Sequence, residues 1–158
     1  RYIGQRVACV QDYLGRRIAV EPAAYYATPA PPELTEPEFL AAIVAEADCD
    51  VLLDVNNLEV NRINHGTDPH AMMAAVPADR VAYIHIAGHR REAEDLAIDS
   101  HGARVAPAVW RLLEAAYERF GPRPTLLERD YDLPPLAELM AEVGAVRGVQ
   151  AVEGVPVA

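Results

Sequence analysis

The sequence predicts an α/β fold in which short parallel strands alternate with helices. Four short apolar runs are each followed by a segment with helical periodicity, and the runs are continuous, as is typical of parallel strands buried on both faces. A hydrophobic content of 51% is sufficient for a packed core. The chain has 158 residues, whereas a complete eight-unit barrel usually needs about 200 or more. We therefore predict about four βα units, half of a TIM-type (β/α)8 barrel.

The chain opens with a predicted helix and a first strand. Apolar residues at helical spacing are followed by a glycine stop signal: Ile3, Val7, Val10, Leu14 and Gly15. The apolar run 18–20 is the first predicted strand, and the proline-rich stretch from Thr28 to Pro32 is a predicted loop. Thr35 and Glu38 form a capping-box pattern, which predicts that a helix begins there.

Three more strands and three more helices follow. The run 51–53 is the second predicted strand, and Asp68-Pro69 predicts the start of a helix. The run 81–86 is the third strand, and 125–127 the fourth. Prolines before apolar periodic segments predict helices that begin near Pro107 and just after Pro134 and Pro135. We expect one partial barrel domain over 1–147 and a tail without assigned structure over 148–158. A doubly wound open sheet is the alternative, although the glycine-rich phosphate turn of dinucleotide folds is absent.

Charge and cysteine content exclude several classes of partner. A formal net charge of −10 disfavours nucleic acid and anionic membrane surfaces. No stretch approaches the roughly 18 apolar residues of a membrane span. Cys9 and Cys49 are far apart and form no C-x-x-C pattern, which is typical of a reducing compartment, so we predict a cytoplasmic location. The sequence starts at Arg1 inside a helical pattern, which suggests a fragment of a longer protein.

A residue able to bind a metal occurs at the end of each predicted strand. Glu21, Asp54 and Glu128 directly follow the first, second and fourth strands, and His85 ends the third. In a barrel these carboxyl ends converge on one mouth, where active sites lie. Carboxylates packed together there would repel one another until cations neutralise them. The pattern therefore predicts a metal site.

Further candidate ligands lie in the segments after the strands. The amide oxygen of Asn57 is a neutral ligand candidate, although an Asn pair also indicates a turn. Asp99 and His101 flank one residue, so an extended backbone would place both side chains on the same side. His65 and His89 are candidates for lining the mouth. The seven candidate ligands exceed the needs of one tetrahedral zinc ion, and imidazoles mixed with carboxylates suit iron or manganese.

Five blocks of the sequence occur in an order that resembles a known family: 52–57 (LLDVNN), 64–66 (NHG), 84–89 (IHIAGH), 98–102 (IDSHG) and 125–130 (TLLERD). They are similar to the multinuclear non-haem iron-dependent oxidative enzymes (MNIO), which are MbnB-like, from about Ile3 to about Val146. The resemblance implies a barrel that holds two or three iron ions in mixed Fe(II)/Fe(III) states. It also implies a dioxygen-using oxidase that modifies cysteine residues of a ribosomally synthesised precursor peptide, often with a peptide-binding partner protein.

The resemblance implies roles for individual residues. The central iron cluster would be held by Glu21, Asp54, His85 and Glu128. A further iron would be held by Asn57, Asp99 and His101. Four other residues are expected to contact these ligands or the substrate: Asn56, His65, His89 and Asp130.

The sequence departs from the family pattern in two ways. Pro22 follows Glu21 where the family commonly has Asn. The family's first strands, which supply two further histidine ligands, would precede Arg1. The resemblance therefore implies that this sequence is the C-terminal half of a TIM-type (β/α)8 barrel, and we expect the N-terminal half to be missing and this piece alone to be inactive.

Two other functions remain open. The first is a divalent-metal-dependent sugar isomerase or epimerase on a similar barrel, although the sequence contains no lysine to support that chemistry. The second is a non-catalytic remnant that reuses the fold.

Overall fold

The main sheet contains four parallel strands in the order β1-β2-β3-β6. The computed structural model describes residues 1–28 and 33–152. The strands are β1 (Ala19–Val20), β2 (Asp50–Asp54), β3 (Val81–Ala87) and β6 (Thr125–Glu128). The predicted parallel α/β fold is confirmed, and four such strands are compatible with part of a (β/α)8 barrel. No closed barrel is formed by the described residues.

Five helices occur where the sequence predicted them. They are α1 (Tyr2–Leu14), α2 (Glu36–Ala47), α4 (Pro69–Ala75), α5 (Pro107–Phe120) and α6 (Leu136–Val152). Gly15 ends α1 with a φ of 64°, and Thr35 and Glu38 form the predicted capping box of α2. The sequence assigned no structure after 147, but α6 continues to Val152, and Gln150 Nε2 donates a hydrogen bond to Arg123 O at 3.0 Å. The remainder of that tail, 153–158, lies outside the described residues.

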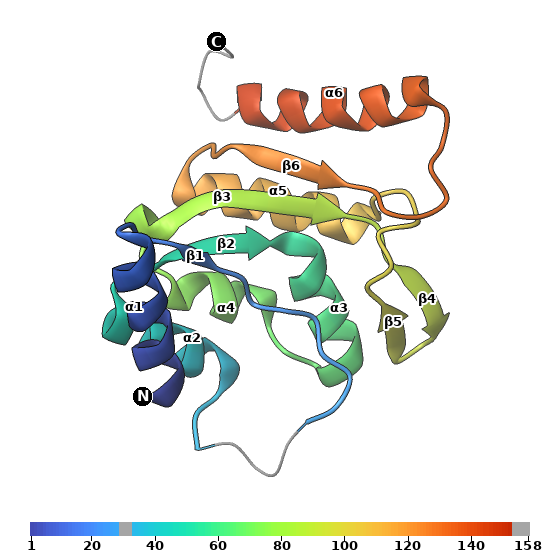
Figure 1. The fold of residues 1–158 in the computed structure, drawn as a ribbon. Helices are drawn as coiled ribbons and strands as arrows, with labels where there is room; N and C mark the ends of the chain where they lie inside the picture. The colour runs from blue at the N-terminus through green and yellow to red at the C-terminus, as the bar shows by residue number, and fades with distance from the viewer. Residues whose placement is uncertain (29–32, 153–158) are drawn as a thin grey trace.

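Four elements were not predicted from the sequence. Helix α3 (Val55–His65) follows β2 directly, where the paired asparagines had suggested a turn. Its N-cap is Asp54, whose side chain accepts a hydrogen bond from the backbone N–H of Asn57. This bond stabilises the start of a helix at the position where a turn had been predicted. Strands β4 (Arg90–Ala93) and β5 (Leu96–Ile98) form an antiparallel hairpin, which lies beyond the carboxyl end of β3 (Figure 1). A short 3-10 turn, η1 (Ala78–Arg80), precedes β3.

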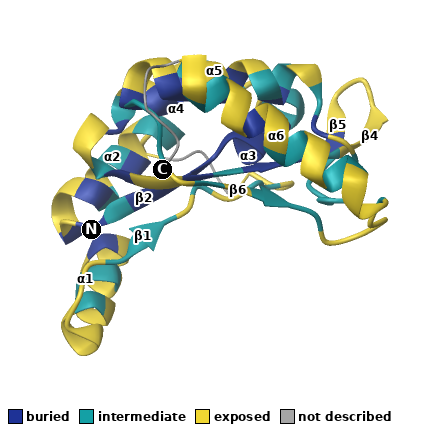
Figure 2. Cartoon of the chain, turned by 90° about the horizontal axis from the view of Figure 1, so that it is seen from above, coloured by how far each residue is buried: buried dark blue, intermediate teal, exposed yellow. Residues whose placement is uncertain are grey.

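The hydrophobic core lies between the sheet and the helices on one of its faces. Buried residues concentrate between the strands and helices α3, α4 and α5 (Figure 2). Ile84 and Ile86 of β3 point into this core and are fully buried. Tyr83 and Leu126, on the opposite face of β3 and β6, are 37% and 51% exposed. Among the described residues, no helix is both long and apolar enough to cross a membrane.

The strand register brings the polar residues to the same end of the sheet. Asp54 of β2 is paired with His85 of β3, and Ala87 of β3 is paired with Glu128 of β6. Side chains of paired residues on neighbouring strands project from the same face. The candidate ligands therefore lie on the face of the sheet that the core helices leave open.

Candidate metal centre

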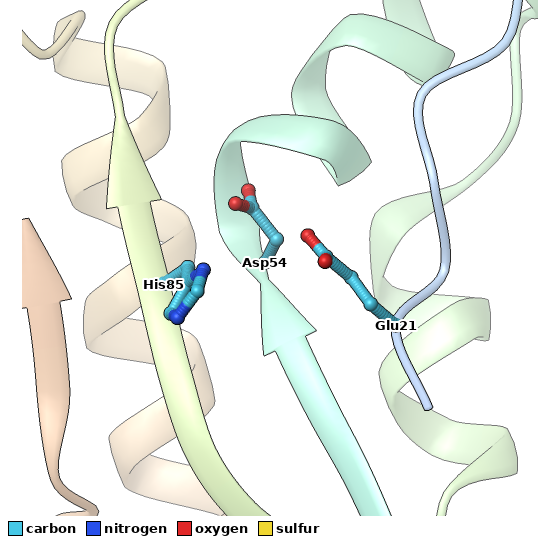
Figure 3. Close-up of side chains that lie close together, drawn as sticks. All are labelled: Glu21, Asp54 and His85. Carbon is cyan, nitrogen blue, oxygen red and sulfur yellow. The ribbon is translucent and has the colours of Figure 1, made fainter. Parts of the chain in front are cut away.

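Two groups of three potential ligands share one carboxylate. Glu21, Asp54 and His85 each offer an atom within 4.8 Å of the others, and Figure 3 shows their side chains pointing toward one another. Asp54, His101 and Glu128 form a second group with the same spacing. Because Asp54 belongs to both groups, the geometry is suited to two neighbouring cations bridged by one carboxylate.

Asp54 is fixed by the start of helix α3. Its Oδ1 accepts the N–H of Asn57 at 2.8 Å, while its Oδ2 is buried without a hydrogen-bond partner. The residue is only 1% exposed. Burial is the main reason that the pKa of this carboxyl is raised to about 7. The hydrogen bond from Asn57 opposes the rise, and the charges of Glu21 and Asp99 add to it. A cation at Oδ2 would remove the penalty of ionising this group.

Asn57 orients Glu21. Its Nδ2 donates hydrogen bonds to Glu21 Oε1 at 3.1 Å and to Pro22 O at 3.3 Å. Its Oδ1 is buried without a partner, so it remains available as a neutral ligand. The pKa of Glu21 is raised, first by burial and then by the charges of Glu128 and Asp99, although His85 opposes this.

His85 and Glu128 connect the two groups of ligands. His85 Nδ1 lies 3.0 Å from Glu128 Oε1, and Glu128 Oε2 lies 3.3 Å from His101 Nδ1. The Nδ1 of His85 is buried, and its contact with Glu128 lacks hydrogen-bond geometry. The sequence placed His85 at a strand end, whereas β3 continues through Ala87. The pairing of β2 with β3 nevertheless brings His85 level with Asp54.

Asp99 and His101 contact each other, but by a different route from the one predicted. His101 Nε2 lies 2.9 Å from Asp99 Oδ1, and its Nδ1 lies 3.2 Å from Asp130 Oδ2. The backbone is not extended here, because His101 has a φ of 49°, a left-handed conformation that is uncommon for histidine. Such strain is often found at functional sites. The hydrogen bond with Asp99 raises the pKa of His101 to about 9, despite an opposing effect of burial.

A chain of hydrogen bonds leads from this pair to His89. Asn56 Nδ2 donates to Asp99 Oδ1 at 2.7 Å, and His89 Nδ1 lies 2.8 Å from Asn56 Oδ1. Because an amide oxygen only accepts, the proton is placed on Nδ1 of His89, and Nε2 keeps a free lone pair. Burial lowers the pKa of His89, which favours this neutral form.

His65 lies outside both groups of ligands. Its ring stacks on Tyr25 with the centroids 3.9 Å apart, and its Nε2 lies 2.8 Å from Tyr25 O. It therefore supports the segment after β1. Sequence reasoning missed three further residues around the site, Tyr26, Asn61 and Asn64. Tyr26 OH accepts the N–H of Asp99 at 2.9 Å. The spacing of Asn57, Asn61 and Asn64 places them on one helix face, a signal that depends on first recognising α3.

The available ligand atoms fit a cation of the iron or manganese type. Buried atoms of the cluster without a hydrogen bond include Asp54 Oδ2, Asn57 Oδ1 and His85 Nδ1, whereas His101 Nε2 contacts Asp99 Oδ1 at 2.9 Å. Carboxylate, imidazole and amide groups surround them, and neither cysteine takes part, since Cys9 is exposed on α1 and Cys49 precedes the opposite end of β2. Structural zinc sites usually contain cysteine in tetrahedral sets, so this mixed set favours a different cation.

Comparisons with known proteins identify similar sequences over nearly the whole chain. A family model described as RiPP precursor modification enzyme MbnB/TglH/ChrH matches residues 1–151. A UPF0276 protein of Nitrosospira multiformis is 49% identical over 151 residues, which cover 96% of this chain and 53% of that protein. A UPF0276 protein of Pseudomonas aeruginosa is 51% identical over 150 residues, which cover 95% of this chain and 52% of that protein. The chain thus spans about half the length of the curated relatives it matches.

Proposed function

The chain belongs to the family of RiPP precursor modification enzymes MbnB/TglH/ChrH, and on that premise we propose that it carries ligands of an iron-dependent oxidase. The proposed substrate is a cysteine residue of a ribosomally synthesised precursor peptide, and dioxygen is the co-substrate. The observation that carries the proposal is the pair of ligand groups that share Asp54. We also propose that the protein is related to the enzymes of methanobactin biosynthesis. We further propose that the chain forms part of a complete (β/α)8 barrel.

The proposed ligands form two sets. Glu21, Asp54, His85 and Glu128 would hold the central cluster, and the membership of Asp54 in both groups of potential ligands supports this assignment. Asn57, Asp99 and His101 would hold a further ion, for a total of two or three irons in mixed oxidation states. When bound, iron would supply affinity for the peptide thiolate and the electrons that reduce dioxygen.

The residues of this chain would fix the geometry of the centre. Asn57 holds Glu21 Oε1 by a hydrogen bond, which leaves Glu21 Oε2 free to bind. Asn56 holds Asp99 in the same way, and His89 keeps Asn56 oriented through its Nδ1 proton. Loss of a hydrogen bond that orients a metal ligand in this way typically weakens metal affinity 10- to 100-fold. With its proton on Nδ1, His89 would be able to accept a proton or a hydrogen bond at Nε2.

The proposed partners follow from the family and the charge. We propose a cysteine-containing precursor peptide as substrate, a peptide-binding partner protein, and action in the cytoplasm. The net charge of −10 disfavours nucleic acid as an alternative partner. Both cysteines are free among the described residues, as is usual in a reducing compartment.

The test uses the natural protein that carries this sequence, loaded anaerobically with Fe(II) and mixed with its cysteine-containing precursor peptide. We expect no change of peptide mass without air and a modified product after air is admitted. A peptide with serine in place of cysteine, and the Asp54→Ala enzyme, are the negative controls. An unchanged peptide mass in air, with iron bound, would contradict the oxidase proposal. Conversion of a sugar by the Mn(II)-loaded protein in the absence of dioxygen would instead favour the sugar isomerase or epimerase alternative.

A further inference from the structure

Two asparagines of helix α3 hold the backbone of two different ligand-bearing segments. Asn61 and Asn64 lie one turn apart on α3, on the same helix side as Asn57. Each uses both its amide oxygen and its amide nitrogen to bind backbone atoms distant in sequence.

Asn61 holds the segment after β1. Its Oδ1 accepts the N–H of Tyr25 at 3.1 Å, and its Nδ2 donates to Ala23 O at 3.1 Å. Asn61 is only 3% exposed, and both bonds are partly buried. Residues 21–28 form neither helix nor strand, and this segment therefore depends on such bonds for its position. Glu21 lies only two residues before Ala23.

Asn64 holds strand β5. Its Oδ1 accepts the N–H of Ala97 at 2.7 Å, and its Nδ2 donates to Ala97 O at 3.0 Å. The amide thus pairs with one residue of the strand much as a neighbouring strand would. Ala97 is fully buried against α3, and Asp99 follows it by two residues.

We propose that Asn61 and Asn64 are positioning residues of the metal centre, each of which sets one ligand: Asn61 sets Glu21, and Asn64 sets Asp99. This inference rests on the proposed function. The rigid body between the two segments is α3, which also begins at Asp54. The helix therefore fixes the distance between the Glu21 group and the Asp99–His101 pair.

The expected effects of the two variants differ in location. Asn61→Ala should weaken Fe(II) binding at the Glu21 group about 10- to 100-fold and affect the Asp99 site less, and Asn64→Ala should do the reverse. Anaerobic Fe(II) titration, with bound metal counted after desalting, measures affinity. Hydrogen exchange of the metal-free protein gives an independent readout. Asn61→Ala should speed exchange at the Tyr25 amide and leave the Ala97 amide protected, with the opposite result for Asn64→Ala.

Gln11→Ala is the matched control. Gln11 also binds two distant backbone atoms, since its Oε1 accepts the N–H of Ile18 at 3.0 Å and its Nε2 donates to Ala47 O at 2.7 Å. These contacts lie at the amino end of the sheet, away from the ligands. Gln11→Ala should therefore lower stability to urea without changing Fe(II) affinity. If an alanine variant does not fold, Asn61→Asp or Asn64→Asp retains the acceptor for the amide and loses the donor to the carbonyl.

The outcomes separate the two proposals. If the unvaried protein binds no Fe(II), the proposed metal centre fails and this inference fails with it. If the unvaried protein binds Fe(II) and both asparagine variants bind it as Gln11→Ala does, the positioning roles alone are overturned. Equal weakening of both sites by each variant would also overturn the assignment of one asparagine to one ligand.

Discussion

Asp54 combines three structural roles in one side chain. It ends β2, it caps α3 through Oδ1, and it belongs to both groups of potential ligands, with Oδ2 buried and without a hydrogen-bond partner. The cap bond fixes the carboxylate plane, so Oδ2 is oriented before any cation binds. Such preorganisation lowers the entropic cost of binding. The same burial makes the ionised carboxylate unfavourable when no cation is present.

The metal-free protein should therefore lose stability as the pH rises. The pKa of Asp54 is about 7 in the folded chain against 3.8 ordinarily, so its contribution is fully present below pH 3.8 and is lost as the pH rises through 7. We expect urea unfolding with a chelator present to show a lower free energy at pH 8 than at pH 5, by on the order of 3 kcal/mol. Asp54→Asn keeps a good N-cap and should flatten much of this slope. An unchanged slope in that variant would contradict the argument.

His101 provides a second measurable titration. Its pKa of about 9 comes first from Asp99, so Asp99→Asn should lower it toward the ordinary value of 6.5. The asparagine has nearly the same shape but no charge. NMR titration of the imidazole signals in the metal-free protein measures the change. Asp132→Asn, which changes a nearby exposed acid that is not among the causes of the shift, is the control. A pKa that stays near 9 in Asp99→Asn would show that a group other than Asp99 stabilises the protonated form of His101.

At the scale of elements, the end of β3 and the segment that carries His101 depend on close backbone contact. A Cβ added at Gly88 would lie 2.0 Å from Ala103 O and 2.6 Å from Arg104 O. Both contacts are with backbone, which cannot move aside as a flexible side chain does. The absence of a side chain at Gly88 therefore lets the backbone of Ala103 and Arg104, close to His101, lie against the end of β3.

Gly88→Ala should displace this segment. We expect a loss of about 1–3 kcal/mol in the free energy of unfolding, together with weaker metal binding at His101. The control is Gly144→Ala in α6, where an added Cβ meets no atom within 4 Å and should stabilise the helix by up to about 1 kcal/mol. Urea unfolding and Fe(II) titration of both variants give the comparison. Wild-type stability and affinity in Gly88→Ala would contradict the proposed contact.

Element by element, the sequence predicted those structures whose signals are local. The helix starts at Thr35, Asp68 and Pro107 carry capping residues or an N1 proline, and these were correct. Helix α3 was missed because its asparagines favour turns in isolation, whereas tertiary contacts satisfy their amides in the folded chain. The hairpin β4–β5 was missed because all of β4 is exposed, so no apolar alternation marks it.

The candidate site was partly predictable, because some of its residues stand at positions that local sequence patterns mark. Strand-end positions identified Glu21, Asp54, His85 and Glu128, although β3 continues past His85 to Ala87. The register of the sheet brings His85 level with Asp54. The roles of Asn61 and Asn64 depend on contacts between residues more than 30 positions apart. The left-handed backbone of His101 also depends on its surroundings. No local pattern contains that information.

At the scale of the whole molecule, the site connects segments from Glu21 to Glu128. The core lies on one face of the sheet, and the ligands lie on the other face, at the carboxyl ends of the strands. The carboxylates among these ligands therefore repel one another, and no core side chain of the described residues lies between them to separate their charges. A cation bound between them would bridge four separate parts of the chain and would favour the folded state over the unfolded state.

Metal binding should accordingly stabilise the protein, and more at neutral pH than in acid. At a free Fe(II) concentration 100 times the dissociation constant, one site adds about 2.7 kcal/mol to the free energy of unfolding. Protons compete for Asp54 and His101, so the gain should shrink at pH 5. Anaerobic urea unfolding with and without Fe(II), at both pH values, measures it. Addition of a chelator should reverse the gain, and Asp54→Ala should abolish most of it because both ligand groups lose their shared member. A gain that is equal at both pH values, or is retained in Asp54→Ala, would mean that the cation binds elsewhere on the chain.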